Sequence, residues 1–129
     1  DDFINKNFIL EFTKYMEDFD FIFGDLIVFD QHKKIKIKQK FKNNFLKYFY
    51  YPLGSGNLYK KNLWKKIGGY NERYYYKDDV YFWSNINNIN DVKIKYINKS
   101  CYYYRKHNNS MSKNILRKYI TLFKIIIFN

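Results

Sequence analysis

The chain has 129 residues, a formal net charge of +12 and an aromatic fraction of 23%. Its apolar and aromatic composition excludes an intrinsically disordered chain, and the single cysteine, Cys101, excludes an internal disulfide framework and a cysteine-rich zinc site. No apolar run approaches the roughly 20 residues that a membrane span needs.

Periodicity and turn residues predict the secondary structure in chain order. Apolar side chains at helical spacing favour helices, runs rich in Ile, Val and aromatic residues favour strands, and Pro and Gly mark the breaks. The expected elements are a helix over 6–19, a strand over 20–29, an exposed edge strand over 33–40, short helices over 41–50 and 60–66, a short strand over 57–59, a tyrosine-rich loop over 70–77, a helix from Asp78 or Asp79 to about 88, strands over 92–97 and 101–105, and a terminal amphipathic helix over 113–128. This mixture predicts an α/β or α+β domain in one piece.

Charge is distributed unevenly along this order. Residues 31–66 carry eleven lysines and no acid, and residues 92–129 carry nine basic residues and no acid. The excess indicates an anionic partner such as nucleic acid, anionic lipid or a phosphate-bearing substrate. Because acidic and basic stretches alternate, the pattern suits a site that holds both a metal ion and a phosphate.

Two acidic pairs are candidates for chemistry. Adjacent acids such as Asp1-Asp2 can hold a hard divalent cation through oxygen ligands, although an exposed pair near a helix start is the structural alternative. Asp78-Asp79 follows Gly68-Gly69 and an aromatic loop, which is a suitable position for a general base. The structural alternative is that the glycine pair ends one helix and the acidic pair caps the start of the next, with no functional role for either pair.

Three further stretches carry both a functional and a structural interpretation. Tyr104-Arg105-Lys106-His107 can contact phosphate or a metal ion, or can be a strand that ends in a solvated basic loop. The turn Gly54-Ser55-Gly56-Asn57 is not a P-loop, and can shape a sugar pocket or be an ordinary turn. The terminal helix can lie on an anionic membrane surface, but packing against the domain is the favoured interpretation.

The order and spacing of these pieces resemble the second half of a family 2 glycosyltransferase of the GT-A fold. Ile67-Gly68-Gly69-Tyr70-Asn71-Glu72 resembles the family's Ile-Gly-Gly-Phe-Asp-Glu, and Asp78-Asp79, with Trp83 behind, takes the place of its Glu-Asp pair. Tyr104-Arg105-Lys106-His107 with Ser110 resembles its Tyr-Arg-x-His-x-x-Ser. The opening Asp1-Asp2 resembles the end of its metal-binding Asp-x-Asp stretch. The resemblance covers residues 1–113.

The resemblance implies an incomplete GT-A (nucleotide-diphospho-sugar transferase) fold. Residues 1–113 would be the C-terminal part of the domain, without its nucleotide-binding half, and residues 114–129 a terminal amphipathic helix that packs on the domain or lies near a membrane. The chain opens Asp-Asp without an initiator Met or signal peptide, which also leads us to expect a fragment. We expect the full-length protein to be an enzyme and this piece alone to be inactive.

The implied activity is metal-assisted, inverting transfer of a sugar from a nucleotide-sugar donor to a glycan or lipid-linked acceptor. It implies Mg²⁺ or Mn²⁺ as cofactor, no nucleic-acid partner, a role in making cell-surface polysaccharide, and a place in the cytoplasm or at the inner face of the membrane. Asp79 would be the general base, and Asp78 would bind the acceptor or tune Asp79. The implied binding residues are Arg105, His107, Gly54, Ser55, Gly56, Asn57 and Tyr70 for donor and substrate, and Asp1, Asp2 and His107 for the metal.

Two other readings of the chain remain open. Its charge and aromatic content also suit a nucleic-acid-binding module, in which basic residues contact phosphates and rings stack on bases. A non-catalytic, carbohydrate-binding relative of the transferases is the third interpretation.

Overall fold

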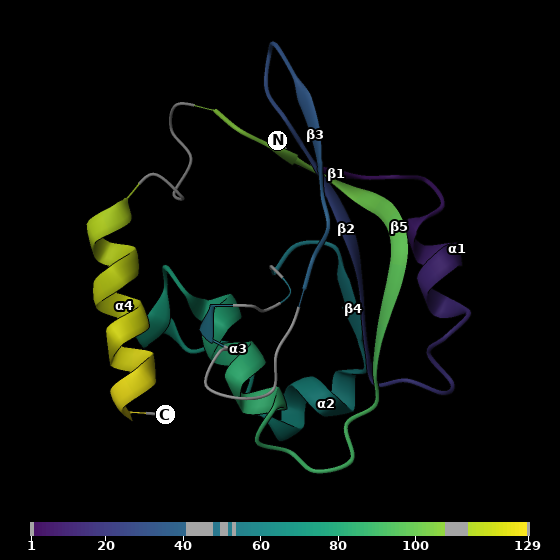
Figure 1. Cartoon of the computed structure of the whole chain (residues 1–129). Helices are drawn as coiled ribbons and strands as arrows, with labels where there is room; N and C mark the ends of the chain where they lie inside the picture. The colour runs from purple at the N-terminus through teal and green to yellow at the C-terminus, as the bar shows by residue number, and fades with distance from the viewer. Residues whose placement is uncertain (1, 41–47, 50–51, 53, 108–113, 129) are drawn as a thin grey trace.

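The computed structural model describes residues 2–40, 48–49, 52, 54–107 and 114–128, and it has an α/β architecture, a mixed sheet flanked by helices (Figure 1). In chain order the elements are β1 (Phe3–Ile4), α1 (Phe8–Thr13), β2 (Phe21–Phe29), β3 (Lys34–Ile37), β4 (Asn57–Tyr59), α2 (Lys61–Lys66), the 3₁₀ helix η2 (Glu72–Tyr74), α3 (Asp78–Ile86), β5 (Ile94–Arg105) and α4 (Ile115–Phe128). The predicted α/β class is confirmed.

Strand β2 is the centre of the sheet. It runs parallel to β5 on one edge, and on the other edge its first half pairs with β4 and its second half with β3, both antiparallel. β1 extends the sheet beyond β5, so the five strands of the described chain follow the order β1-β5-β2-β3, with β4 beside β2. The lysine-rich β3 is the predicted exposed edge strand.

Helices cover both faces of this sheet (Figure 1). Adjacent residues of a strand project to opposite faces. Ile22 accordingly packs with Phe8 and Phe12 of α1. Phe21 and Phe23 pack with side chains of α2 and α3, among them the buried Leu63, Phe82, Trp83 and Ile86. α4 lies outside α3, where Leu122 and Ile125 pack against Val80.

The carboxylate of Asp20 joins three segments at the start of β2. It accepts hydrogen bonds from the Lys60 ammonium group and from the backbone N–H of Lys93, both at 3.0 Å. Burial by itself would raise the pKa of Asp20, but these hydrogen bonds and positive charges outweigh burial and lower the pKa. Asp20 therefore fixes the start of β5 and the junction between β4 and α2 against β2.

Several predicted boundaries were wrong for local physical reasons. The helix predicted over 6–19 ends at Thr13, because the chain then tightens into turns in which Tyr15 and Met16 donate to the carbonyl groups three residues earlier. The strands predicted over 92–97 and 101–105 are one strand, β5, which is irregular where it passes Gly24 and Asp25. The tyrosine-rich loop contains η2.

Other predicted elements are confirmed. α2 ends at the glycine pair, since Gly68 and Gly69 have φ of +79° and +72° and donate to the carbonyl groups of Lys65 and Trp64.

Most of the helix predicted over 41–50 lies outside the described residues. Within the described part of the chain, no helix combines the length and apolar character needed to cross a membrane.

The first prediction concerns the attachment of α4. Ile125 is fully buried, whereas Ile120 on the same helix is 48% exposed. Replacing Ile125 with Ala leaves a cavity and is expected to lower the free energy of unfolding by about 2–4 kcal/mol, whereas Ile120→Ala changes it by less than about 0.5 kcal/mol. Urea unfolding measures both values, and equal effects would contradict the observed packing of α4.

The second prediction concerns the Asp20 clamp. Asp20→Ala removes the acceptor of both hydrogen bonds and is expected to cost about 1–3 kcal/mol at pH 7. Because the pKa of Asp20 is lowered in the folded protein, this contribution is present above the ordinary value of 3.8 and is lost as the pH falls below it. Unfolding measured from pH 7 to pH 3 tests this, with the exposed Asp18→Ala as control.

Candidate functional site

The acidic pair lies at the first turn of α3. Asp78 and Asp79 begin the helix, where a carboxylate complements the partial positive charge of the free N–H groups. Asp79 accepts hydrogen bonds from the N–H of Val80 at 2.8 Å and from the N–H of Gly54 at 3.4 Å. A Cβ atom at Gly54 would lie 3.2 Å from the Cβ of Asp79, so a residue without a side chain allows this close approach.

The environment of Asp79 makes its carboxylate more basic than usual. Burial raises the pKa of Asp79, the positive charge of Lys77 opposes this increase, and the negative charge of Asp78 adds to it, with a raised pKa as the result. The residue as a whole is only partly buried. A carboxylate with a raised pKa on a partly exposed residue is well suited to accept a proton.

Lys77 is a neighbour that the sequence interpretation did not include. Burial lowers its pKa, the charge of Asp79 raises it, and the charge of Lys118 on α4 lowers it further, so the net shift is downward. Lys77 is therefore within electrostatic range of both Asp79 and Lys118 of α4. The signal in the sequence was a lysine directly before two aspartates.

Tyr70, predicted to line a pocket, is within electrostatic range of the same acidic pair. Its hydroxyl is 3.1 Å from that of Tyr59, and its ring stacks on Phe82 with the centroids 4.9 Å apart. Burial, the Tyr59 hydroxyl and the charges of Asp78 and Asp79 all raise the pKa of Tyr70, so the hydroxyl remains protonated. Tyr70 thus carries a protonated hydroxyl, paired with that of Tyr59, within electrostatic range of the two carboxylates.

The acid near the start of the chain is tied to β5. Asp2 accepts hydrogen bonds from the Tyr102 hydroxyl at 2.9 Å and from the N–H of Arg105 at 2.8 Å. Tyr102 is also hydrogen-bonded to Ser55. A Cβ atom at Gly56 would lie 3.0 Å from the Cβ of Tyr102, and the φ of Gly56 is +75°, so this position suits glycine on both grounds.

The turn 54–56 therefore connects the two acids. Gly54 contacts Asp79 at one end of the turn, and Ser55 and Gly56 contact Tyr102, which holds Asp2, at the other. The structure brings together five of the predicted positions by this route: Asp2, Gly54, Ser55, Gly56 and Asp79. Asn57 follows the turn directly, in β4.

The predicted phosphate-binding residues lie at the end of β5. Arg105 is the last residue of β5 and meets Asp2 through its backbone, and the side chains of Arg105 and His107 are exposed. Asp1 and Ser110 lie outside the described residues. The basic end of β5 is thus next to Asp2, whereas Asp79 is hydrogen-bonded to Gly54 of the turn and to Val80 of α3.

The predicted metal ligands are only partly described. Asp2 supplies the type of oxygen atom that Mg²⁺ prefers, but the described residues contain no group of three or more His, Cys, Asp or Glu side chains that could hold an ion. The described residues by themselves do not complete a metal site.

A second carboxylate, Asp25, was missed by the sequence interpretation. It is 1% exposed, and it accepts hydrogen bonds from the Tyr96 hydroxyl at 2.8 Å and the N–H of Gln39 at 3.3 Å, with Lys36 at 3.1 Å as its ion-pair partner. Burial and the bond to Asp25 raise the pKa of Tyr96 to about 12. An acid within the apolar run DFIFGDLIVF was the signal, because a buried charge needs dedicated partners.

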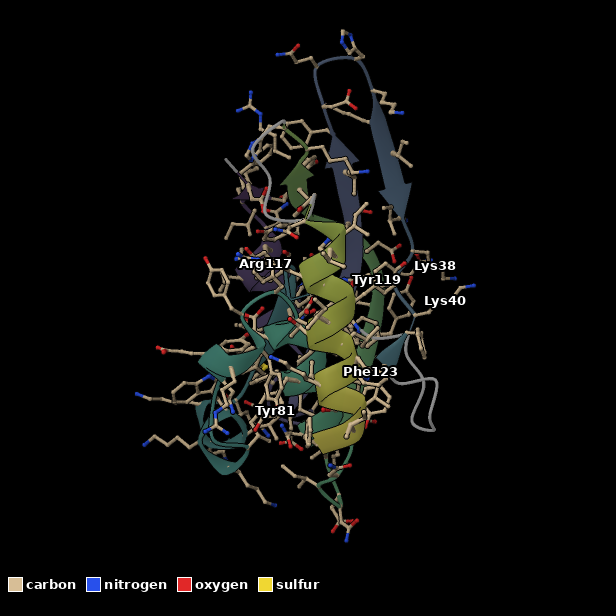
Figure 2. The ribbon with its side chains drawn as sticks, turned by 90° about the vertical axis from the view of Figure 1, so that its left-hand side faces the viewer. Lys38, Lys40, Tyr81, Arg117, Tyr119 and Phe123 are labelled. Carbon is tan, nitrogen blue, oxygen red and sulfur yellow. The ribbon has the colours of Figure 1, made fainter. Side chains whose placement is uncertain are left out.

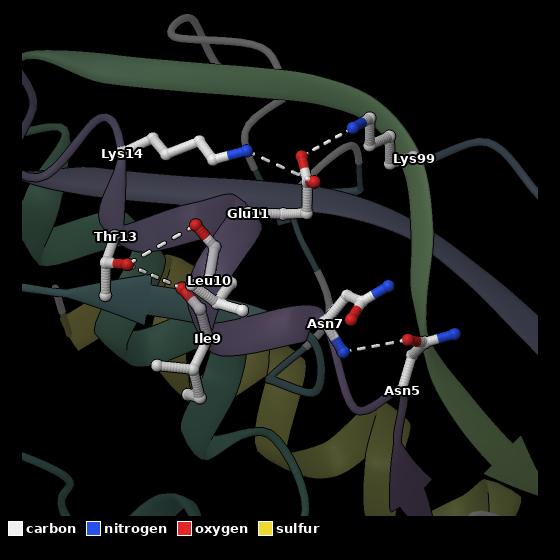
Figure 3. A network of polar contacts seen from close by, with 8 residues as sticks. All are labelled: Asn5, Asn7, Ile9, Leu10, Glu11, Thr13, Lys14 and Lys99. Atoms are coloured by element: carbon white, nitrogen blue, oxygen red, sulfur yellow. Dashed lines mark hydrogen bonds and ion pairs between the residues drawn. The ribbon is translucent and has the colours of Figure 1, made fainter.

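A hollow of about 320 Å³ lies between α1 and β5, away from Asp79. Figure 3 shows Glu11 at this place, where its carboxylate binds Lys14 at 3.3 Å and also Lys99. The hydrogen bond from Lys99 and then that from Lys14 lower the pKa of Glu11. The hollow is lined mostly by amide and charged side chains: Asn5, Asn7, Glu11, Lys36, Asn98, Lys99 and Ser100. None of the predicted site residues is among them.

No protein-family model matches the sequence, and a search of curated proteins finds no match.

The third prediction follows from the raised pKa of Asp79. A carboxyl whose pKa is higher in the folded protein than in the unfolded chain destabilises the fold once it ionises, that is, above its ordinary value of 3.8. Asp79→Asn, which is neutral at every pH, is therefore expected to be more stable than the unaltered protein at pH 7. This advantage should disappear as the pH falls below 3.8.

Thermal unfolding from pH 7 to pH 3 measures the effect. Asp18→Asn, on an exposed loop, is the control for the loss of one negative charge. A lower stability of Asp79→Asn than of the unaltered protein at pH 7 would show that the carboxylate is held by favourable contacts and contradict the prediction.

Proposed function

We propose that this protein is a glycosyltransferase of the GT-A type, which transfers a sugar from a nucleotide-sugar to a hydroxyl group of an acceptor with inversion at the anomeric carbon. One observation carries the proposal: the carboxylate of Asp79, with its raised pKa, is linked through the 54–56 turn to Tyr102 and Asp2. The order of motifs along the chain and the helix-flanked mixed sheet support it.

In the proposed reaction, Asp79 acts as the general base. The acceptor hydroxyl oxygen forms a bond to the anomeric carbon of the donor, the bond from that carbon to the diphosphate oxygen breaks, and the hydroxyl proton passes to Asp79. The nucleoside diphosphate leaves with the bonding electrons. The raised pKa of Asp79 favours the proton transfer, and Asp78 contributes to that pKa through its charge.

The surrounding residues have binding roles in this proposal. Tyr70 and the 54–57 turn supply a ring, a hydroxyl and backbone groups near Asp79, which suits a sugar or acceptor with several hydroxyls. Arg105 and His107, exposed at the end of β5, are placed to attract phosphate oxygens. We retain Mg²⁺ or Mn²⁺ as the expected cofactor, which would stabilise charge on the departing diphosphate.

A nucleic-acid-binding module is the second candidate, because the net charge of +12 favours it. Stacking on bases requires exposed rings. The rings of Phe21, Phe23 and Trp83 are instead buried in the core between β2 and α3. Other rings, such as those of Phe3, Tyr75 and Phe128, are exposed. Ring burial therefore does not decide between the two candidates, and the order of motifs along the chain is what favours the transferase.

The fourth prediction is a loss of turnover in Asp79→Asn. Removing the base is expected to lower sugar transfer or donor hydrolysis by a factor of about 10²–10⁴. Asp78→Asn, the adjacent carboxylate, is the matched variant and should retain more activity. The assay uses the protein with a panel of nucleotide-sugars as donors.

The same preparation distinguishes the alternatives. Loss of turnover on chelation with EDTA and recovery with Mg²⁺ or Mn²⁺ would support the cation. Turnover that is unaffected by Asp79→Asn would refute the assigned base. Absence of turnover with every donor, together with tight and salt-dependent RNA binding, would favour the nucleic-acid-binding module.

A further inference from the structure

We propose that α4 is a membrane-docking helix, whose outer face inserts into the headgroup region of an anionic bilayer while its inner face remains packed on the domain. This proposal goes beyond the sugar transfer proposed above and does not depend on it.

The inner face of α4 fixes the helix to the domain. Thr121, Leu122 and Ile125 are its buried residues. Leu122 and Ile125 form a cluster with Val80 of α3 and with Tyr48. Arg117 adds a hydrogen bond of 3.2 Å to the Tyr76 hydroxyl, above whose ring its guanidinium group lies. Among the described residues, these contacts of the inner face set the orientation of α4.

The outer face of α4 is a stripe of large apolar side chains. Its members recur at intervals of three and four residues, which places them on one side of a helix: Leu116, Tyr119, Ile120, Phe123 and Ile127. Their exposed fractions range from 48% for Ile120 to 71% for Leu116. Figure 2 looks onto α4 from outside, with Tyr119 and Phe123 along it. Isolated exposed apolar residues are ordinary, but a contiguous row of five marks an interaction surface.

The charge of α4 identifies the partner. The helix carries Arg117, Lys118 and Lys124 and no acid, and the whole stretch 92–129 has nine basic residues and no acid. Arg117 and Lys124 are seven residues apart, so they lie on one side of the helix, along an edge of the apolar stripe. An apolar stripe with basic residues along one edge is typical of helices that lie in the surface of anionic membranes.

Two other occupants fit less well. A second copy of the chain would bring two basic helices together, and like charges oppose that contact. Within the described residues α4 covers 14 residues, fewer than the roughly 20 that a span needs. A helix that lies in the plane of an anionic surface satisfies both the stripe and the charge.

Vesicle flotation tests the proposal on the whole 129-residue chain. We expect binding to vesicles of phosphatidylcholine with about 30 mol% phosphatidylglycerol, at least about tenfold stronger than to phosphatidylcholine alone, and weaker in high salt. Phe123→Ser should lower this binding about tenfold, because it removes a large ring from the stripe. Lys124→Gln should lower it about fivefold.

Matched variants separate these effects from general ones. Leu10→Ser on α1 removes an apolar side chain that is 65% exposed, as Phe123 is, and should leave binding unchanged. Lys66→Gln on α2 removes the same charge as Lys124→Gln from another exposed position and should have less effect. Circular dichroism establishes that all four variants are folded.

Three results would overturn the proposal. One is equal binding to neutral and anionic vesicles, and another is binding that Phe123→Ser and Leu10→Ser lower alike. The third is absence of vesicle binding together with a dimer in analytical ultracentrifugation that Phe123→Ser dissociates. That last result would assign the outer face of α4 to a second copy of the chain.

Discussion

The position of every site residue depends on how neighbouring segments are attached to β2. Asp20 makes this attachment at the start of the strand, since its carboxylate binds Lys60 and the backbone of Lys93, and its own backbone exchanges hydrogen bonds with the same two residues. Lys60 directly follows β4, which begins immediately after the 54–56 turn, and Lys93 directly precedes β5, which carries Tyr102. A shift of either segment along β2 would separate the turn from Tyr102 and hence from Asp2. The site is therefore assembled by strand register, with Asp20 as one of the contacts that define it.

Packing against this frame also determines the chemistry of Asp79. The carboxylate stands at the start of a helix, a favourable place for a negative charge, yet its pKa is raised because burial outweighs the two backbone hydrogen bonds and the charge of Lys77. The next residue, Val80, is fully buried against Leu122 and Ile125 of α4. This packing of α3 on α4 fixes the first turn of α3, which carries Asp79. A fold that retains a destabilised acid at a partly accessible position is typical of a functional site.

The sequence predicts the elements better than it predicts their joining. β2, β4, α2 and α3 lie close to their expected bounds, because periodicity and glycine caps are local signals. The interruption expected between 97 and 101 is a bulge within β5, and it depends on Gly24, where an added Cβ would lie 2.7 Å from the Lys99 carbonyl oxygen. A local pattern cannot reveal such a contact between distant segments. The acidic pair was recognisable as a candidate because it is a local pattern. The hydrogen bond between Tyr102 and Asp2, one hundred residues apart, and the partners of Asp25 were not recognisable, because they join distant segments.

The terminal helix shows why one hydrophobic pattern can have two causes. α4 carries apolar residues around most of its circumference, so its sequence suits both packing on the domain and lying on a membrane. In the structure Leu122 and Ile125 pack on the domain, whereas the stripe that includes Phe123 is exposed. The two faces are then parts of one arrangement. The inner face packs on Val80, the neighbour of the proposed base, so a bilayer bound at the outer face would lie on the same side of the domain as α3. An acceptor anchored in that bilayer would be confined near Asp79, and confinement to a surface raises its local concentration. If both proposals hold, a lipid-linked acceptor is therefore favoured over a freely diffusing glycan.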